Sequence, residues 1–154
     1  MSETPERAFH LQRFYVKDLS YEVPGAPEVF LTPVQPRVNL QLNTEARALG
    51  DSGSDFEVVL SVTVTAENED GKVLYLAEVV QAGIFTLVGF EGEERDHLLG
   101  AYCPNLLFPY AREAVSDLVN RGSFPQLLLQ PINFDALYAD ARARQADGAE
   151  APTH

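Results

Sequence analysis

Cys103 and His97 are the two side chains whose types could together form a nucleophile and its general base. They lie six residues apart, and Pro104 follows the cysteine directly. Cysteine is also among the residue types that proteins bury most often, where it packs as a small apolar side chain. We therefore expect Cys103 to be a buried structural thiol, and a cysteine-dependent enzyme is the alternative that it leaves open.

The other residues with chemical potential do not form a recognisable site. Glu93 and Glu94 lie in a charged run that is typical of a solvated helix start. The segment 89–92 (GFEG) lacks the Gly-Lys-Ser/Thr ending of a phosphate-binding loop. Three distant histidines and one cysteine do not complete a structural zinc site. The sequence therefore predicts no catalysis, no cofactor and no metal.

The chain is strongly acidic, with 11 basic and 23 acidic side chains over 154 residues and a net charge of −12 at pH 7. Nucleic acids and anionic lipids bind Lys and Arg, so this charge argues against both as partners. Residues 1–10 lack the apolar segment of a secretion signal, and no apolar run approaches the roughly 20 residues that cross a bilayer. We expect a cytoplasmic protein with no direct membrane insertion. We expect one domain over residues 1–145 and a disordered polar tail over 146–154.

Alternation of apolar and polar side chains predicts four strands in the first half of the chain. The segments with this pattern are 9–15, 38–42, 56–65 and 73–79, and the last continues as an apolar run to residue 90. In the first segment, period two places Phe9, Leu11, Arg13 and Tyr15 on one face. Residues 68–71 (NEDG) predict a tight hairpin between the third and fourth strands.

The second half of the chain changes to a helical period. A stripe of apolar side chains predicts a helix over 109–121, with Pro109 in its first turn and Gly122 at its end. Residues 93–102 predict a shorter helix that ends before Pro104. Asn133 or Asp135 is expected to cap a last helix that runs to Gln145. Strands followed by helices predict an α+β fold, with a four-stranded antiparallel sheet and helices packed on one of its faces.

Two long connections combine prolines with apolar side chains. Residues 21–36 contain four prolines together with Phe30 and Leu31, and residues 122–131 contain Phe124 and Leu128. Long loops inside compact domains are usually functional or disordered. These loops either pack on the core of their own domain or present apolar side chains to a partner.

Residues 100–113 (GAYCPNLLFPYARE) resemble the SecB family of protein-export chaperones. The resemblance continues through 121–127 (RGSFPQL) and 131–137 (PINFDAL), and upstream it includes 15–22 (YVKDLSYE), 62–66 (VTVTA) and 81–85 (QAGIF). It extends in order from about residue 9 to residue 137. The sequence departs from the family in 33–36 (PVQP), which lacks the tryptophan common there, and matches it poorly over 45–55.

The resemblance implies a homotetramer built as a dimer of dimers. It also implies an ATP-independent holdase that binds unfolded secretory precursor proteins and delivers them to the SecA motor. Its SecA-binding positions correspond here to Asp18, Glu22, Leu76 and Glu78. The family's client groove is bordered by the two Pro-rich loops, and the residues expected to line it are Phe30, Leu31, Tyr75, Tyr110, Phe124 and Leu128. A small hydrophobic-ligand binding protein remains the alternative function, for which we would expect a closed cavity.

Overall fold

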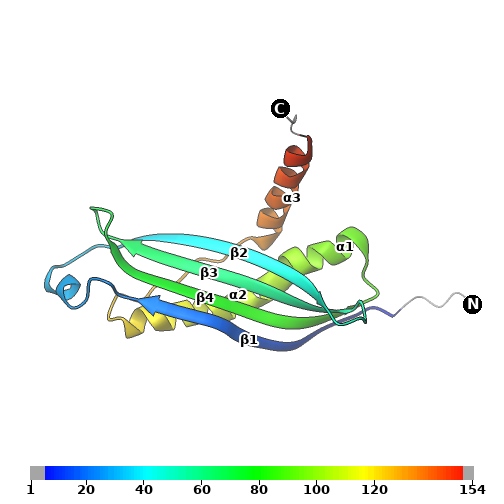
Figure 1. The fold of residues 1–154 in the computed structure, drawn as a ribbon, viewed down its shortest axis with the longest axis horizontal. Helices are drawn as coiled ribbons and strands as arrows, with labels where there is room; N and C mark the ends of the chain where they lie inside the picture. Colours follow the sequence, from blue (N-terminus) through cyan, green and yellow to red (C-terminus); the bar gives the residue numbers. More distant parts are fainter. Residues whose placement is uncertain (1–5, 151–154) are drawn as a thin grey trace, which may run out of the picture.

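The computed structural model describes residues 6–150, with side chains through residue 146. Its first half is a four-stranded antiparallel sheet in the order β1-β4-β3-β2 (Figure 1). The strands are β1 (Ala8–Glu22), β2 (Arg37–Leu49), β3 (Asp55–Glu67) and β4 (Val73–Val88). The α+β class and the four strands predicted from period-two alternation are confirmed. The strands are longer than the sequence pattern predicted.

One face of the sheet is covered by helices, and the other is open. Alternate residues of the two central strands are buried, because β-strand side chains point to opposite faces in turn. The buried apolar residues on the helix side of β3 and β4 are Phe56, Val58, Leu60, Val62, Val64, Ala66, Tyr75, Ala77, Val79, Phe85 and Leu87. Burying each large apolar side chain contributes roughly 1.5–3 kcal/mol. The core therefore lies between the sheet and the helices, and the face turned to the viewer in Figure 1 is open.

The helical layer is one continuous helical segment, formed by α1 (Gly92–His97), a π-helical turn (Leu98–Tyr102) and α2 (Cys103–Arg121). The predicted break at Pro104 is wrong. Its missing N–H costs little at the start of α2, and the preceding turn uses i→i−5 bonds such as Cys103 N–H to the Leu98 carbonyl. Pro109 accordingly lies inside α2 and does not begin it.

The last helix, α3 (Phe134–Glu150), projects from the body beside β2 (Figure 1). Asn133 caps it, because its side-chain oxygen accepts the Ala136 N–H at 3.0 Å. At its base the Tyr138 ring packs so closely on Gly100 that a Cβ there would approach the ring to 2.6 Å. The helix continues past the predicted end at Gln145 to Glu150. The rest of the predicted tail, 151–154, lies outside the described residues.

The faces of β1 differ from the simple alternation. A bulge between Leu11 and Arg13 adds one residue without a partner on β4. After it, Phe14 takes the helix side, where it stacks on an aromatic ring of α2, while Arg13 and Tyr15 face the open side. The prediction that residues 9, 11, 13 and 15 share one face is therefore wrong.

The predicted hairpin joins β3 and β4. The side-chain oxygen of Asn68 accepts the N–H groups of Asp70 and Lys72, both at 2.9 Å, and Gly71 takes a positive φ of 82°. The loop from β1 to β2 (residues 23–36, the crossover loop) contains the short 3₁₀ helix η1 (Glu28–Leu31). Among the described residues, no helix is long and apolar enough to cross a membrane.

Candidate functional site: an aromatic cluster and an acidic sheet face

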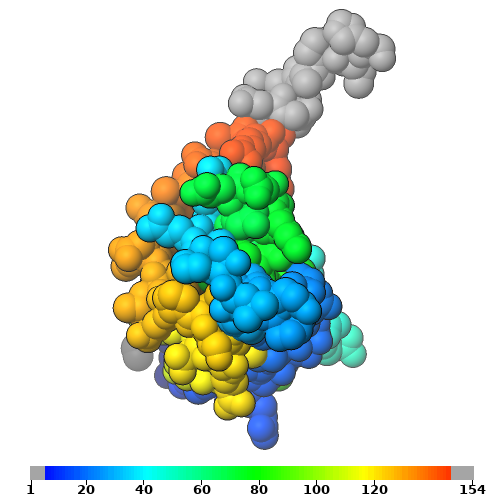
Figure 2. Space-filling model, turned by 90° about the vertical axis from the view of Figure 1, so that its left-hand side faces the viewer, coloured from blue at the N-terminus to red at the C-terminus, as the bar shows by residue number. Residues whose placement is uncertain are grey.

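Four aromatic rings meet at the end of the sheet where the crossover loop lies (the aromatic cluster: Tyr21, Phe30, Tyr75 and Phe124). Phe124 is central, with ring centroids 4.9 Å from Tyr75 and 5.5 Å from Phe30, and Tyr21 lies 6.0 Å from Tyr75. These spacings are those of favourable aromatic pairs. The rings come from β1, the crossover loop, β4 and the helix-connecting loop (residues 122–133). Figure 2 shows the crossover loop in blue beside the yellow end of α2 and the start of this second loop.

The cluster has a buried base and an exposed rim. Tyr75 is only 2% exposed, so it supports the other rings and does not itself form a surface. Phe30 is 48% exposed, and Phe124 is half-buried between them. The structure thus brings together three of the predicted groove residues in a cluster of tilted rings, and its outer member, Phe30, faces solvent.

Tyr21 is a member that sequence reasoning missed. Its ring lies against Gly122, where an added Cβ would overlap the hydroxyl and approach Cζ to 2.7 Å. Burial raises the pKa of the Tyr21 hydroxyl to about 12. The sequence offered only a tyrosine near the end of the first strand and a glycine at the end of the main helix. These two residues are 101 positions apart, and the fold brings them into contact.

The other three predicted groove residues lie outside the aromatic cluster. Leu31 is 82% exposed on η1, next to Phe30. Leu128 is exposed beside the polar side of α2, where it lines a hollow with Arg112 and Gln126. Tyr110 stacks on Phe14 of β1, with centroids 4.2 Å apart. These three residues would extend a groove beyond the aromatic cluster, but they do not form one pocket with it.

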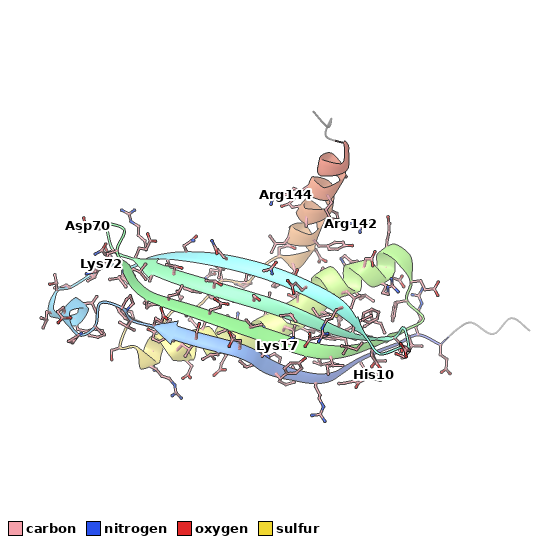
Figure 3. All side chains as sticks on the ribbon, viewed as in Figure 1. His10, Lys17, Asp70, Lys72, Arg142 and Arg144 are labelled. Carbon is pink, nitrogen blue, oxygen red and sulfur yellow. The ribbon has the colours of Figure 1, made fainter. Side chains whose placement is uncertain are left out.

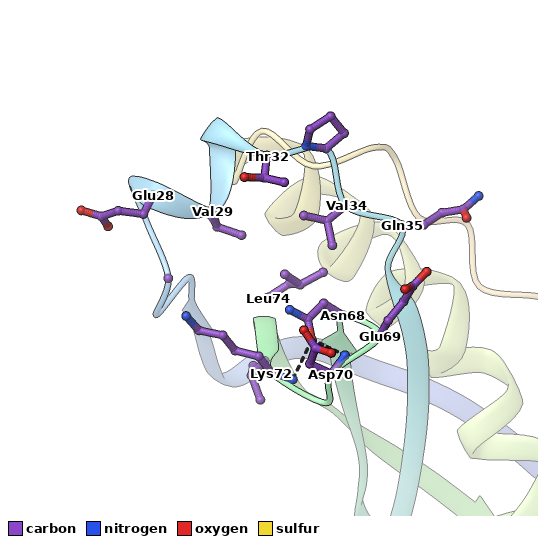
Figure 4. A pocket seen from close by; sticks show the side chains of 13 residues that line it. Glu28, Val29, Thr32, Val34, Gln35, Asn68, Glu69, Asp70, Lys72 and Leu74 are labelled. Atoms are coloured by element: carbon purple, nitrogen blue, oxygen red, sulfur yellow. Dashed lines mark hydrogen bonds between the residues drawn. The ribbon is translucent and has the colours of Figure 1, made fainter.

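The crossover loop also borders a cavity of about 500 Å³ against the β3–β4 hairpin (Figure 4). Val29, Val34 and Leu74 point into it, and Glu69 and Asp70 of the hairpin also line it. Carriers of small hydrophobic ligands enclose them in largely apolar cavities. A cavity between two loops that mixes apolar with acidic and basic side chains does not favour that alternative.

The four predicted SecA-binding residues share the open face of the sheet (the acidic face: Asp18, Glu22, Leu76 and Glu78). Glu22 pairs with Leu76, and Ser20 lies between the two acids of β1 opposite Glu78. Paired residues of antiparallel strands point to the same side. Asp18 and Glu22 are exposed, and Leu76 and Glu78 are half-buried. The result is an acidic surface with an apolar residue within it.

A buried acid lies further along the same face. Glu57 of β3 is 4% exposed and accepts a hydrogen bond from the Tyr15 hydroxyl, while Lys17 and Arg47 contact its Oε1 at 3.0 and 2.9 Å. The Tyr15 hydrogen bond and the two cations lower the pKa of Glu57 to about 2, against the opposing effect of burial. Burial and the Glu57 hydrogen bond raise the pKa of Tyr15 to about 12.

Cys103 is a structural thiol, as expected. Its side chain is fully buried in the core, and burial raises the pKa of the thiol to about 12. A nucleophilic cysteine needs a lowered pKa and access to its substrate. His97 instead contacts Asp135 at 2.7 Å and the Tyr138 ring. The proposed nucleophile and base are therefore not paired, which argues against a cysteine-dependent enzyme.

A sheet with one open acidic face and an exposed aromatic cluster at its end is suited to holding other polypeptides at its surface, and this is the class of chaperones. The chain belongs to the SecB family: the family model described as preprotein translocase subunit SecB matches residues 2–145. By this membership it is a protein-export chaperone.

Relatives of similar length support the same assignment. A protein-export protein SecB of Alcanivorax borkumensis is 60% identical over 152 residues, covering 98% of this chain and 96% of the relative. One from Hydrogenovibrio crunogenus is 52% identical over 145 residues, covering 94% and 95%. A Mycobacterium tuberculosis SecB-like chaperone, solved in complex with a ChAD peptide from the HigA1 antitoxin, has a TM-score of 0.66 at 22% identity and covers 80% of this chain and 90% of its own. This last likeness shows the shared fold.

Proposed function

We propose that this chaperone is an ATP-independent holdase of the bacterial cytoplasm, which binds unfolded secretory precursors and delivers them to SecA. The observation that carries the proposal is the aromatic cluster. Its rim, Phe30, is 48% exposed at the junction of two Pro-rich loops, while Tyr75 beneath it is buried. An apolar surface left open at a loop junction favours a binding role.

The cluster suits clients that share no sequence. Unfolded chains have exposed backbone and scattered apolar side chains in common, and aromatic rings bind such side chains with low specificity. Phe30 and Leu31 lie on a loop that is stiffened by prolines, which lowers the entropic cost of binding. Several such sites on one assembly raise the affinity for a long chain through effective concentration.

The charge of the chain selects among clients. A net charge of −12 per subunit attracts basic segments at low salt and repels acidic ones. The same charge should keep an assembly with exposed aromatic residues in solution.

The acidic face suits a different partner from the aromatic cluster. Asp18, Glu22 and Glu78 would accelerate and orient the encounter with a basic surface, and Leu76 would add apolar contact. We propose that this partner is SecA. Release of the client then follows from SecA binding that weakens client binding, which is a coupling of two binding free energies.

We propose a homotetramer, built as a dimer of dimers. β1 and β2 form the two edges of the sheet, and unpaired strand edges favour association with another chain. Phe14, Val16 and Leu19 of β1 are 44–49% exposed, which leaves apolar surface along one edge. Light scattering at micromolar concentration should give the mass of four chains, and a stable monomer would contradict this assembly.

The holdase function is tested by refolding a slow-folding secretory precursor without nucleotide. An equimolar amount of tetramer should hold most of the precursor unfolded, and added ATP should change neither the extent nor the rate of arrest. Unchanged refolding in the presence of the tetramer would refute the proposal.

A further inference from the structure

Glu57 joins three strands on the open face of the sheet. It lies on β3, receives Tyr15 and Lys17 from β1 across β4, and receives Arg47 from β2. Figure 3 shows Lys17 on the sheet face that is turned to the viewer. The carboxylate is almost fully buried although Lys17 and Arg47 are exposed, since the side chains of its partners fold over it. A buried charge with three partners is costly to rearrange, so it fixes the side chains that reach it.

Lys17 is the extra residue of the second bulge of β1. Val16 pairs with Gln81 and Asp18 pairs with Val80, which are consecutive on β4, so Lys17 has no partner of its own. Two residues of a bulged strand then oppose one residue of its neighbour, and both point to the same side. Lys17 and Asp18 accordingly both face the open side.

The position of this bulge decides which side chains form the acidic face. If Lys17 instead paired with Val80, every later residue of β1 would move by one position on β4. Because side chains alternate with period two, Asp18 and Glu22 would then turn toward the helices. The bulge at Lys17 places both acids on the open face, in register with Leu76 and Glu78.

We propose that Glu57 is a positioning residue for the acidic face: by holding Lys17 as the bulged residue of β1, it keeps Asp18 and Glu22 on the open side. Glu57 itself does not contact SecA in this account. The inference about binding rests on the proposed function, whereas the inference about register does not.

The register can be measured apart from SecA. Ser20 lies directly opposite Glu78, so cysteines at these two positions report the native pairing by the yield of their disulfide. We would compare this yield in the tetramer with and without Glu57→Gln, which removes the charge and keeps the shape. Glu45→Gln is the matched control, because it removes one charge from an exposed residue of β2 on the same face. SecA titrations would use the same substitutions without the added cysteines.

Deleting Lys17 supplies an internal rescue. Without this residue, Val16 and Asp18 would become neighbours in a regular ladder with Gln81 and Val80, so the register would no longer need Glu57. The deletion combined with Glu57→Gln should therefore restore the disulfide yield. If Glu57→Gln does not assemble, Lys17→Met tests the same contact by removing the cation.

We expect Glu57→Gln to lower the disulfide yield and weaken SecA binding, each by about fivefold or more, while Glu45→Gln changes neither. An unchanged yield in Glu57→Gln would overturn the proposal. So would a loss that deletion of Lys17 does not restore, because Glu57 would then act only on overall stability. A lowered yield with unchanged SecA binding would support the positioning role and contradict the assignment of SecA to the acidic face.

Discussion

At the scale of single residues, burial separates the structural groups from those proposed to bind a partner. Cys103 is fully enclosed, with a thiol pKa of about 12, while Phe30 is 48% exposed within a ring cluster. The residue type alone predicted the burial of Cys103, because cysteine is usually buried. Glu57 was missed, since its three partners come from positions 10 to 42 residues away and converge only when the sheet forms.

Cys103→Ser should retain holdase activity and lose stability. A serine hydroxyl in the apolar niche of the thiol would cost about 1–3 kcal/mol. Urea unfolding at fixed protein concentration measures this loss, and precursor arrest at a permissive temperature measures activity. An assembled Cys103→Ser variant without any activity would restore the nucleophile interpretation.

Glu57 should make stability depend on acid pH. Because its pKa is lowered from 4.5 to about 2 in the folded chain, its stabilisation is complete above about pH 4.5 and is lost as the pH falls toward 2. Glu57→Gln should therefore show a shallower loss of unfolding free energy between these values than the parent protein. Denaturant unfolding at several pH values within that window tests the sign. Parallel curves of unfolding free energy against pH for the two proteins would contradict this prediction.

At the scale of elements, the sequence indicated the four strands and the main helices, but not the places in β1 and before α2 where the period changes. Period two predicted the strands well in β3, where alternate residues are buried. It failed in β1, because each of two bulges shifts the alternation by one residue. A bulge depends on pairing with β4, and a single strand's pattern carries little trace of it. The π turn before Pro104 is a similar local change that the helical pattern did not reveal.

The end of α2 holds the aromatic cluster in place. Gly122→Ala would add a methyl group where the Tyr21 ring lies, although the backbone φ of −84° itself accepts alanine. We expect a loss of about 1–3 kcal/mol in stability, as for other overpacked sites, together with weaker client binding. Gly25→Ala is the control, because its Cβ would meet only an ordinary 3.4 Å contact with Val29. Equal stability of the two variants would contradict the close packing at Gly122.

The acidic face should act through charge. Glu78→Lys reverses one charge beside Leu76, so SecA binding should weaken by roughly fivefold and depend less on salt. Client arrest and oligomeric state should not change, because Glu78 lies on the sheet face away from the core. Titrations of SecA and of an unfolded client at low and moderate salt give both results. Unchanged SecA binding together with weaker client binding would show that SecA is the wrong partner for this face.

At the scale of the whole molecule, the sheet separates the two surfaces that we propose as binding sites. The aromatic cluster lies at the junction of two loops at one end, and the acidic face lies on the open side of the same strands. Tyr21 and Glu22 are neighbours in β1 that belong to the cluster and to the acidic face respectively. A partner that moves this end of β1 would therefore act on both surfaces, which gives a physical route for coupling client release to SecA binding.

The central claim is that the aromatic cluster holds unfolded clients. Its most direct test is the refolding time course of a slow-folding precursor, without nucleotide, in the presence of Phe124→Asp. The aspartate places a charge among the aromatic rings, which opposes contact with apolar client side chains. The arrest of refolding should therefore be lost while the assembly stays intact. Gln130→Asp, which places the same charge on an exposed residue of the same loop, should arrest refolding like the parent protein. Full arrest by assembled Phe124→Asp would contradict the account.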